Sequence, residues 1–359
     1  MVNAISLFCG AGGMDVGFET AGIKVLWANE FNYDAVKTYR VNHPNTPVEC
    51  ADVRIAKETL KNHLTQGVDL VFGGPPCQGF SVAGKMDPND ERSTMIWEFF
   101  DVVKIVSPKM FVIENVKALG VLSRWETVRN GIYDRADELG YYCFSRVLNS
   151  SDFGVPQKRE RVFFVGIKAA IKHQDIEGTF DAIIASKRKP CPNLRECLLK
   201  VGKAGTPENP ITCTAKISLA TNPVIRKSPY AGMLFNGMGR PMNLNELANT
   251  LPASMGGNKT PIIDELLLHD SSASDWIVDY HNMLLAGGTI ESAITVPSYL
   301  RRLTIKEAAA IQTFPPEYLF YGEKSSIYRQ IGNAVPCKLA QAVAETIVEL
   351  DRQVLGIAV

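Results

Sequence analysis

Short, continuous apolar runs recur along the first half of the chain and alternate with segments of helical periodicity. The apolar runs occupy residues 4–8, 24–28, 68–72, 110–113 and 162–167. Runs of this length predict strands that are buried on both faces of a sheet. Helical periodicity marks residues 14–21, 95–106 and 125–139. The alternation predicts an α/β fold with a doubly wound sheet.

The most distinctive stretch is residues 73–81, Gly-Gly-Pro-Pro-Cys-Gln-Gly-Phe-Ser, which directly follows the apolar run at 68–72. Its two prolines fix the backbone and remove two amide donors, so Cys77 is expected on a stiff segment at the carboxyl end of a strand. Open α/β sheets bind their ligands at that edge. The pattern favours a functional thiol, and a turn with an incidental buried cysteine is the alternative.

A glycine-rich turn, residues 9–13, joins the first strand to the first helix. Such a turn lets a nucleotide or an S-adenosyl group approach the backbone and the helix N-terminus. Glu30 follows about twenty positions later, at the end of the second strand, where a carboxylate accepts hydrogen bonds from ribose hydroxyls. Phe31 is placed to stack on adenine. The glycines alone fit a nicotinamide-linked oxidoreductase nearly as well, and Glu30 also suits the N-terminus of the next helix.

Charged residues stand beside two further strands. Glu114 follows the run at 110–113, so its carboxylate is expected to face Cys77 across the edge of the sheet. Capping of the next helix is the alternative role for Glu114. Arg159 and Arg161 occupy alternate positions and are expected to share one face of a strand, although a solvated edge strand carries such charges as well.

The second half of the chain is less periodic. Residues 169–298 are richer in Gly, Pro, Asn and Ser, which predicts a loop-rich second domain. Residues 78–94 form a long loop before a helix, and this length predicts a moving functional segment. Thr304 and Glu307 form a capping box that opens a helix. A final amphipathic helix is expected from residue 337 to about residue 354.

The composition of the chain indicates how its charges are distributed and in which cellular compartment it is expected. The 359 residues are 46% hydrophobic with zero formal net charge, yet residues 151–240 hold 15 Lys and Arg against 7 Asp and Glu. A basic third on an acidic body is typical of a surface that follows nucleic-acid phosphates, with a solvated charged face as the alternative. No stretch reaches the roughly 20 apolar residues of a membrane span and no signal segment is seen, so a cytoplasmic protein is expected. Eight scattered cysteines predict neither a metal site nor disulfides.

Residues 74–81, Gly-Pro-Pro-Cys-Gln-Gly-Phe-Ser, resemble the nucleophile motif of the DNA (cytosine-5) methyltransferases, and further motifs follow in the family's order from Phe8 to Pro336. The resemblance implies a class I S-adenosylmethionine-dependent methyltransferase fold, Rossmann-like, with a smaller loop-rich target-recognition domain. It also implies methyl transfer from S-adenosylmethionine to carbon 5 of a cytosine that is flipped out of double-stranded DNA.

The same resemblance assigns the site residues. Cys77 would add to C6 of cytosine, Glu114 would act at N3 and the exocyclic amine, and Arg161 would act at O2 with support from Arg159. The cofactor-binding residues are expected to be Phe8, Gly10, Gly12, Gly13, Glu30, Phe31, Asp52, Val53, Pro75, Asn333 and Val335. DNA contacts are expected at Gln78, Ser81, Lys85, Arg92, Arg240 and Thr250. The catalytic domain would span residues 1–168, the target-recognition domain 169–298, and a segment returning to the catalytic domain 299–359.

Two other functions remain open on this scaffold. A branch of the family methylates tRNA, although the size of the region 169–298 favours a reader of DNA sequence. A catalytically silent DNA-binding relative is the second alternative, and the intact Cys77, Glu114 and Arg161 count against it. We expect a monomeric enzyme of a restriction-modification system, without a stable complex with any cognate restriction endonuclease.

Overall fold

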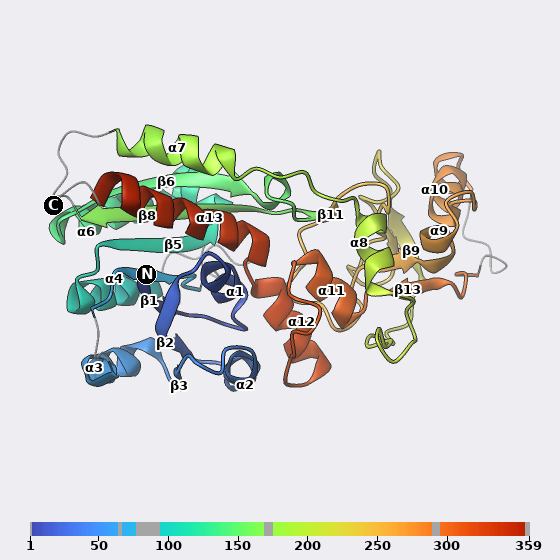
Figure 1. Cartoon of the computed structure of the whole chain (residues 1–359). Coiled ribbons are helices and arrows are strands. Elements are labelled where there is room, and N and C mark those ends of the chain that lie inside the picture. Colours follow the sequence, from blue (N-terminus) through green and yellow to red (C-terminus); the bar gives the residue numbers. More distant parts are fainter. Residues whose placement is uncertain (1, 64–66, 77–93, 169–174, 289–294, 356–359) are drawn as a thin grey trace. The chain divides into compact units, whose positions relative to one another are not determined.

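The chain forms two compact units, which we describe in a computed structural model covering residues 2–63, 67–76, 94–168, 175–288 and 295–355 (Figure 1). Unit 1 consists of Met1–Gly154, Arg159–Pro190 and Val335–Val359, and unit 2 of Val155–Lys158 and Cys191–Ala334. The chain therefore passes between the units several times. The functional domains predicted from the sequence, residues 1–168, 169–298 and 299–359, do not have the same boundaries as these two units. The functional division stays a prediction.

A seven-stranded sheet in the order β3-β2-β1-β4-β5-β8-β6 forms the centre of unit 1. Its strands are β1 (Asn3–Leu7), β2 (Lys24–Glu30), β3 (Val48–Cys50), β4 (Leu70–Gly73), β5 (Met110–Val116), β6 (Tyr141–Asn149) and β8 (Glu160–Lys168). Strands β1 to β5 pair in parallel, whereas β8 runs antiparallel to both β5 and β6. The order reverses between β1 and β4, which is where doubly wound sheets place their ligands. The predicted α/β fold is confirmed.

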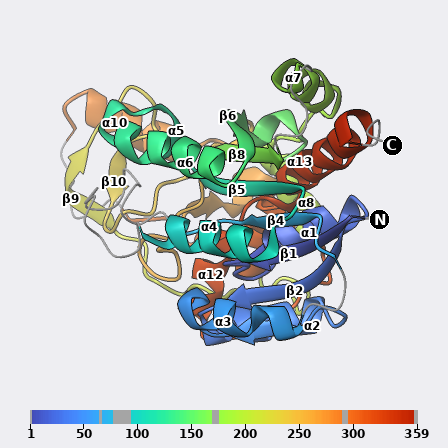
Figure 2. The same cartoon turned by 90° about the vertical axis from the view of Figure 1, so that its left-hand side faces the viewer.

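Helices cover both faces of this sheet. The apolar side chains of α1 (Gly13–Thr20), α7 (Ile176–Ser186) and α13 (Cys337–Leu350) share one core with one face of the sheet. Figure 2 shows the other face, which is covered by α3 (Val53–His63), α4 (Met95–Val106), α5 (Lys117–Val121) and α6 (Glu126–Glu138). Helix α2 (Tyr33–Asn42) follows β2. Burial on both faces explains why the strands read as continuous apolar runs.

The last helix, α13, packs directly on the first helix, α1 (Figure 1). A Cβ atom at Gly17 would lie 2.4 Å from the backbone nitrogen of Gln341 and 2.6 Å from the Cβ of Ala340. Any side chain at residue 17 would therefore push α13 away. The segment after α13, Asp351–Leu355, continues as a turn of π-helix.

Unit 2 is built from short elements. Its helices are α8 (Leu194–Val201), α9 (Glu265–His269), α10 (Trp276–Leu285), α11 (Ile305–Ile311) and α12 (Lys324–Asn333). Its strands form three small pairs, β7 (Gln157–Lys158) with β11 (Ala248–Asn249), β9 (Leu219–Val224) with β10 (Met233–Phe235), and β12 (Ile262–Asp264) with β13 (Leu300–Arg302). The predicted capping box at Thr304 and Glu307 opens α11. No helix within the described part of the chain has the length and apolarity that crossing a membrane requires.

A buried carboxyl group lies in the first turn of α1. Asp15 is fully buried and accepts a hydrogen bond of 2.9 Å from the hydroxyl of Tyr39. Burial raises the pKa of Asp15 from 3.8 to about 6, and the opposing effects of His43 and Tyr39 are smaller. The folded protein thus binds a proton that the unfolded chain has already released at pH 5.

We predict that Asp15→Asn changes how stability depends on pH. Ionisation of Asp15 should lower the free energy of unfolding of the wild type by about 3 kcal/mol between pH 3 and pH 7, because a carboxyl whose pKa is raised by burial disfavours the fold once it ionises. The amide does not ionise and still accepts the Tyr39 hydrogen bond, so the variant should lose this fall. Urea unfolding at a series of pH values measures the difference. The exposed Asp137→Asn serves as control, and an unchanged slope for Asp15→Asn would contradict the prediction.

Candidate active site

Two glycines, Gly73 at the end of β4 and Gly74 directly after it, precede the Pro-Pro-Cys motif. Gly73 pairs with Leu7 on one side and Ile113 on the other, and a Cβ at Gly73 would lie 2.2 Å from the carbonyl oxygen of Leu7. A Cβ at Gly74 would lie 3.0 Å from Oε2 of Glu114. Glycine at these positions lets β4 approach its neighbour and lets the Glu114 carboxylate reach the backbone of the motif.

The motif is also tied to β5. The side-chain amide of Asn115 donates a hydrogen bond of 3.2 Å to the carbonyl oxygen of Pro75, and Asn115 is 1% exposed. The start of the motif therefore lies against the strand that carries Glu114. Five predicted site residues, Cys77, Gln78, Ser81, Lys85 and Arg92, lie outside the described residues.

Glu114 and Arg161 form an ion pair between adjacent strands. Arg161 lies opposite Val116 in the β5–β8 ladder, two positions beyond Glu114 and therefore on the same face. Its Nε atom lies 2.9 Å from Oε1 of Glu114, and both side chains are largely buried, at 14% and 11% exposure. The helix-cap alternative for Glu114 is wrong, because Glu114 lies within β5 and α5 has no side-chain cap.

Burial and two arginines set the pKa of Glu114 in opposite directions. Burial raises the pKa of Glu114, and the charges of Arg161 and Arg159 partly oppose this rise. Arg159 is 1% exposed, and its backbone N–H donates to Oδ1 of Asn149 at 3.2 Å. The alternative of a solvated edge strand is wrong, because β8 lies between β5 and β6 and Arg159 is buried.

The glycine-rich turn and Glu30 lie together at the neighbouring strand ends. Gly10 and Gly12 adopt φ angles of 54° and 82°, and Phe8 is left-handed as well, at 54°. Glu30 accepts a hydrogen bond of 2.9 Å from the N–H of Gly10 and one of 2.7 Å from the N–H of Asn32. Glu30 therefore joins the turn to the start of α2, and burial raises the pKa of its carboxyl.

Three further predicted cofactor residues follow β2 and β3. The side chain of Phe31 is 75% exposed, whereas Val53 is 2% exposed and belongs to the core. Asp52 binds the guanidinium of Arg54 with two hydrogen bonds of 2.9 and 2.7 Å, which lowers the pKa of Asp52. Phe31 and Asp52 thus follow the ends of the paired strands β2 and β3, and they provide an exposed aromatic ring and a carboxylate.

The remaining predicted residues divide between the two units. In unit 1, Gly13 begins α1, and Pro75 and Val335 are buried. In unit 2, Asn333 ends α12 and is exposed, as are Arg240 and Thr250. The hydroxyl of Thr250 donates a hydrogen bond of 2.9 Å to the carbonyl oxygen of Lys158.

Sequence reasoning did not select Asn115, which anchors the motif through Pro75. The available signal was its position, directly after Glu114 at a strand end, because polar residues there are rarely needed for packing. Among the described residues, no group of three or more His, Cys, Asp or Glu side chains is arranged to hold a metal ion.

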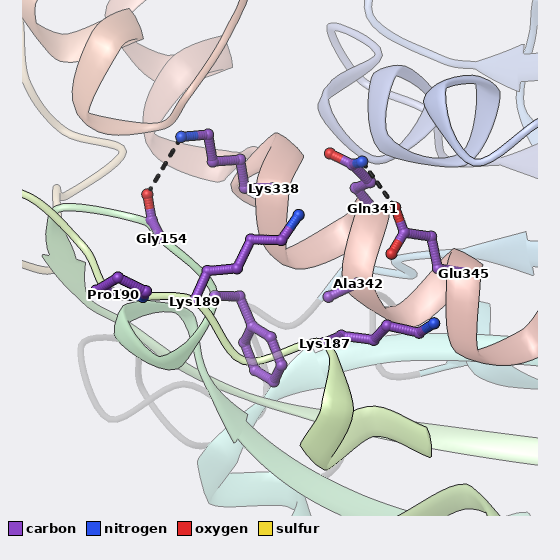
Figure 3. A pocket seen from close by; sticks show the side chains of 9 residues that line it. Gly154, Lys187, Lys189, Pro190, Lys338, Gln341, Ala342 and Glu345 are labelled. Atoms are coloured by element: carbon purple, nitrogen blue, oxygen red, sulfur yellow. Dashed lines mark hydrogen bonds between the residues drawn. The ribbon is translucent and has the colours of Figure 1, made fainter.

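A small surface cavity of about 180 Å³ lies elsewhere in unit 1 (Figure 3). Its described lining residues include none of the predicted site residues. Several of its polar groups bind one another, since Lys338 donates to the carbonyl oxygen of Gly154 at 3.5 Å and Gln341 donates to Glu345 at 2.8 Å. The candidate active site is therefore the set of strand ends around Gly74, Glu114 and Glu30, and not this cavity.

Known proteins match this chain over nearly its whole length. A family model described as C-5 cytosine-specific DNA methylase matches residues 2–349. The Type II methyltransferase M1.HphI of Haemophilus parahaemolyticus is 31% identical over 97% of this chain and 87% of its own length. The Type II methyltransferase M.DdeI of Desulfomicrobium norvegicum is 31% identical over 96% of this chain and 88% of its own length.

Solved structures share the fold at lower identity. The Dnmt2 methyltransferase of S. pombe has a TM-score of 0.63 at 17% identity, covering 98% of this chain and 99% of its own. The methyltransferase EhMeth of Entamoeba histolytica has a TM-score of 0.64 at 17% identity, covering 98% of each chain. At this identity the likeness concerns the fold alone.

We predict that Arg161→Gln raises the pKa of Glu114 further, because the guanidinium favours the charged carboxylate and its removal leaves burial less opposed. Arg159→Gln should raise the same pKa by less. Carboxyl ¹³C NMR titration, with Glu114→Gln used to assign the resonance, measures both shifts. Lys117→Gln, which breaks the exposed pair with Glu160, is the control. An unchanged or lowered pKa in Arg161→Gln would contradict the prediction.

Proposed function

Because the chain belongs to the C-5 cytosine-specific DNA methylase family and is a DNA (cytosine-5) methyltransferase, we propose that Cys77, Glu114 and Arg161 form its catalytic centre. The observation that carries the proposal is the Glu114–Arg161 pair, which lies against the backbone of Gly74, three residues before Cys77. The family match and the Type II relatives favour DNA as the substrate over tRNA, and methyl transfer over DNA binding alone.

The proposed chemistry begins at C6 of the flipped cytosine. The thiolate of Cys77 forms a bond to C6, and electron density moves to C5 and N3. Glu114 would supply a proton to N3 as that charge develops, and burial, which raises the pKa of Glu114, favours the protonated form. Arg161 would stabilise the charge on O2, and Arg159 adds a second buried positive charge near the carboxylate. The charges of the two arginines oppose the rise in the pKa of Glu114 that burial causes.

The strand ends of β1, β2 and β3 fit S-adenosylmethionine, which supplies an electrophilic methyl group when bound. No atom of the described residues lies within 4 Å of a Cβ built on Gly10, so a ligand has room beside the turn. Both Glu30 oxygens accept backbone hydrogen bonds, and a carboxylate oxygen has a second lone pair that a ribose hydroxyl can use. Phe31 would stack on adenine and Asp52 would accept from its amino group.

The remaining cofactor and DNA residues are proposed from the family motifs. Phe8, Gly12, Gly13, Val53, Pro75, Asn333 and Val335 complete the proposed cofactor set. Duplex DNA would be bound by Gln78, Ser81, Lys85, Arg92, Arg240 and Thr250, two of which, Arg240 and Thr250, are exposed on unit 2. We further propose a monomeric cytoplasmic enzyme of a restriction-modification system, as the Type II names of the relatives suggest.

We predict that Glu30→Ala weakens S-adenosylmethionine binding by about 1.5–3 kcal/mol, the range for hydrogen bonds to a charged group. The loss has two sources, the ribose contact and the anchor on the Gly10 N–H. Isothermal titration calorimetry measures the affinity, and Glu58→Ala, on the exposed side of α3, is the control. An affinity equal to that of the wild type would remove Glu30 from the cofactor site.

The covalent step tests the proposed function directly. After methyl transfer the adduct must lose the hydrogen at C5 before Cys77 leaves, and a fluorine at C5 blocks this loss. With duplex DNA that carries 5-fluorocytosine at the target position and S-adenosylmethionine, the protein should form a denaturation-resistant complex linked through Cys77. Cys77→Ser should form none, because a hydroxyl is far less ionised and less nucleophilic than a thiol.

The exposed Cys50 provides the matched control, since Cys50→Ser should form the adduct as the wild type does. Peptide mapping by mass spectrometry identifies the linked residue. A protein that methylates DNA but links through another cysteine would show that the nucleophile is misassigned.

A further inference from the structure

Two fully buried glutamines face each other in unit 2. Gln157, in β7, and Gln312, at the end of α11, each have 0% exposure. The side-chain amide of Gln157 donates to Oε1 of Gln312 at 2.7 Å. The pair joins segments that lie 155 residues apart in the chain.

Further hydrogen bonds on either side of the glutamine pair fix the direction in which its amides donate. The N–H of Leu251 donates to Oε1 of Gln157 at 3.0 Å. Nε2 of Gln312 donates to the carbonyl oxygens of Ile331, at 2.6 Å, and Ala334, at 3.0 Å. The three consecutive steps form one relay, which we call the amide relay, from the N–H of Leu251 to the carbonyls of Ile331 and Ala334.

Only one orientation of the two amides satisfies every bond. The Leu251 N–H requires an oxygen from Gln157, so the NH₂ group of Gln157 must face Gln312. Gln312 must then present its oxygen to Gln157 and its NH₂ group to the two carbonyls. Turning either amide over would set acceptor against acceptor at two fully buried side chains, so the relay specifies one register of its three segments.

Those three segments carry the residues assigned to different parts of the reaction. Residues 248 and 249 pair with Gln157 and Lys158 as a parallel ribbon, and the Thr250 hydroxyl binds the carbonyl of Lys158. The ribbon leads directly into Arg159. The third segment surrounds Asn333, and a Cβ at Gly332 would lie 2.7 Å from the carbonyl oxygen of Pro252.

We propose that Gln157 and Gln312 are positioning residues for methyl transfer, which hold the segment leading to Arg159 and Arg161 in register with the DNA-contacting segment at Thr250. The inference rests on the proposed function, because it concerns the same arginines. An apolar pair of similar volume would also fill the site, but it would fix no direction. The relay thus serves the placement of catalytic groups and not packing alone.

The test compares Gln157→Glu with Gln157→Met across pH. A protonated carboxyl accepts from Leu251 and donates to Gln312, so it rebuilds the relay, whereas a carboxylate presents an acceptor to the Gln312 oxygen. Burial raises the pKa of a carboxyl by up to roughly 3–5 units, which brings its titration into the range of the assay. Methionine has a volume similar to that of glutamine, but it cannot form the hydrogen bonds of the relay at any pH.

We expect Gln157→Met to lower kcat on duplex DNA by about 10²-fold at every pH, the usual effect of misplacing a catalytic group by an ångström. Gln157→Glu should show the same loss at pH 8 and recover most of the wild-type kcat as pH falls to 6. Calorimetric affinity for S-adenosylmethionine should change far less than kcat in both variants, because Gln312 has its own bonds to Ile331 and Ala334 on either side of Asn333. The exposed Gln353→Glu is the matched control and should follow the wild-type profile.

The neighbouring charges on the ribbon do not imitate this response. Lys158 pairs with Glu246 at 3.6 Å and both side chains are exposed, at 56% and 61%. Arg159 carries a guanidinium that stays charged throughout the assay range. A recovery of kcat at low pH in Gln157→Glu, absent from Gln157→Met, therefore reports on residue 157.

A second measurement covers the case in which Gln157→Glu does not fold at pH 8, as far-UV circular dichroism would reveal. Gln157→Met, Gln312→Met and the double variant remain uncharged, and a relay that acts as a unit should make the double loss in kcat no larger than the greater single loss. Three outcomes would overturn the proposal. They are a wild-type kcat in Gln157→Met, a kcat of Gln157→Glu that does not recover as pH falls, and a double variant whose loss in kcat equals the product of the two single losses. A wild-type protein that does not methylate duplex DNA would instead overturn the proposed function.

Discussion

The close approach of backbone to backbone at Gly73 is the constraint on which the site depends. The carbonyl of Leu7 occupies the place where a side chain at residue 73 would begin, so β1 and β4 meet without a gap at the point where the strand order reverses. One residue later the Glu114 carboxylate lies against Gly74. The absence of two side chains thus brings β1, the segment Gly74–Pro76 and β5 to one edge of the sheet, where Glu114 lies.

Much of this arrangement could be predicted from the chain itself. Continuous apolar runs correctly predicted the buried strands, and the helices α1, α4 and α6 begin and end within a residue or so of the periodic segments. The capping box at Thr304 was predicted from local chemistry alone. The positions of Glu114 and Glu30 at strand ends followed from the order of the elements, because parallel strands share one carboxyl edge.

The rest depends on contacts between distant parts of the chain. The Glu114–Arg161 pair exists because β8 inserts antiparallel between β5 and β6, and no local pattern at Arg161 records that pairing. Nothing in the sequence around Gln157 or Gln312 marks the two as partners, and only the fold brings them face to face. Asn115 likewise acquires its role from Pro75 in the neighbouring strand's loop. Such hydrogen-bond partners produce no periodic pattern in the sequence from which they could be predicted.

The packing of α13 on α1 has a consequence for biosynthesis. Eight residues between Val335 and Leu350 belong to the same core as Phe18 and Phe72, so this core contains both the earliest and the latest parts of the chain. While a ribosome is still synthesising unit 2, this face of the sheet lacks α13, and the apolar side chains that α13 would cover stay exposed. Because N-terminal segments emerge first, the apolar surface that α13 covers stays exposed on the nascent chain until the last helix leaves the ribosome. Premature termination after residue 334 would leave that surface open permanently, and chaperones that bind exposed apolar segments are the expected partners of such a chain.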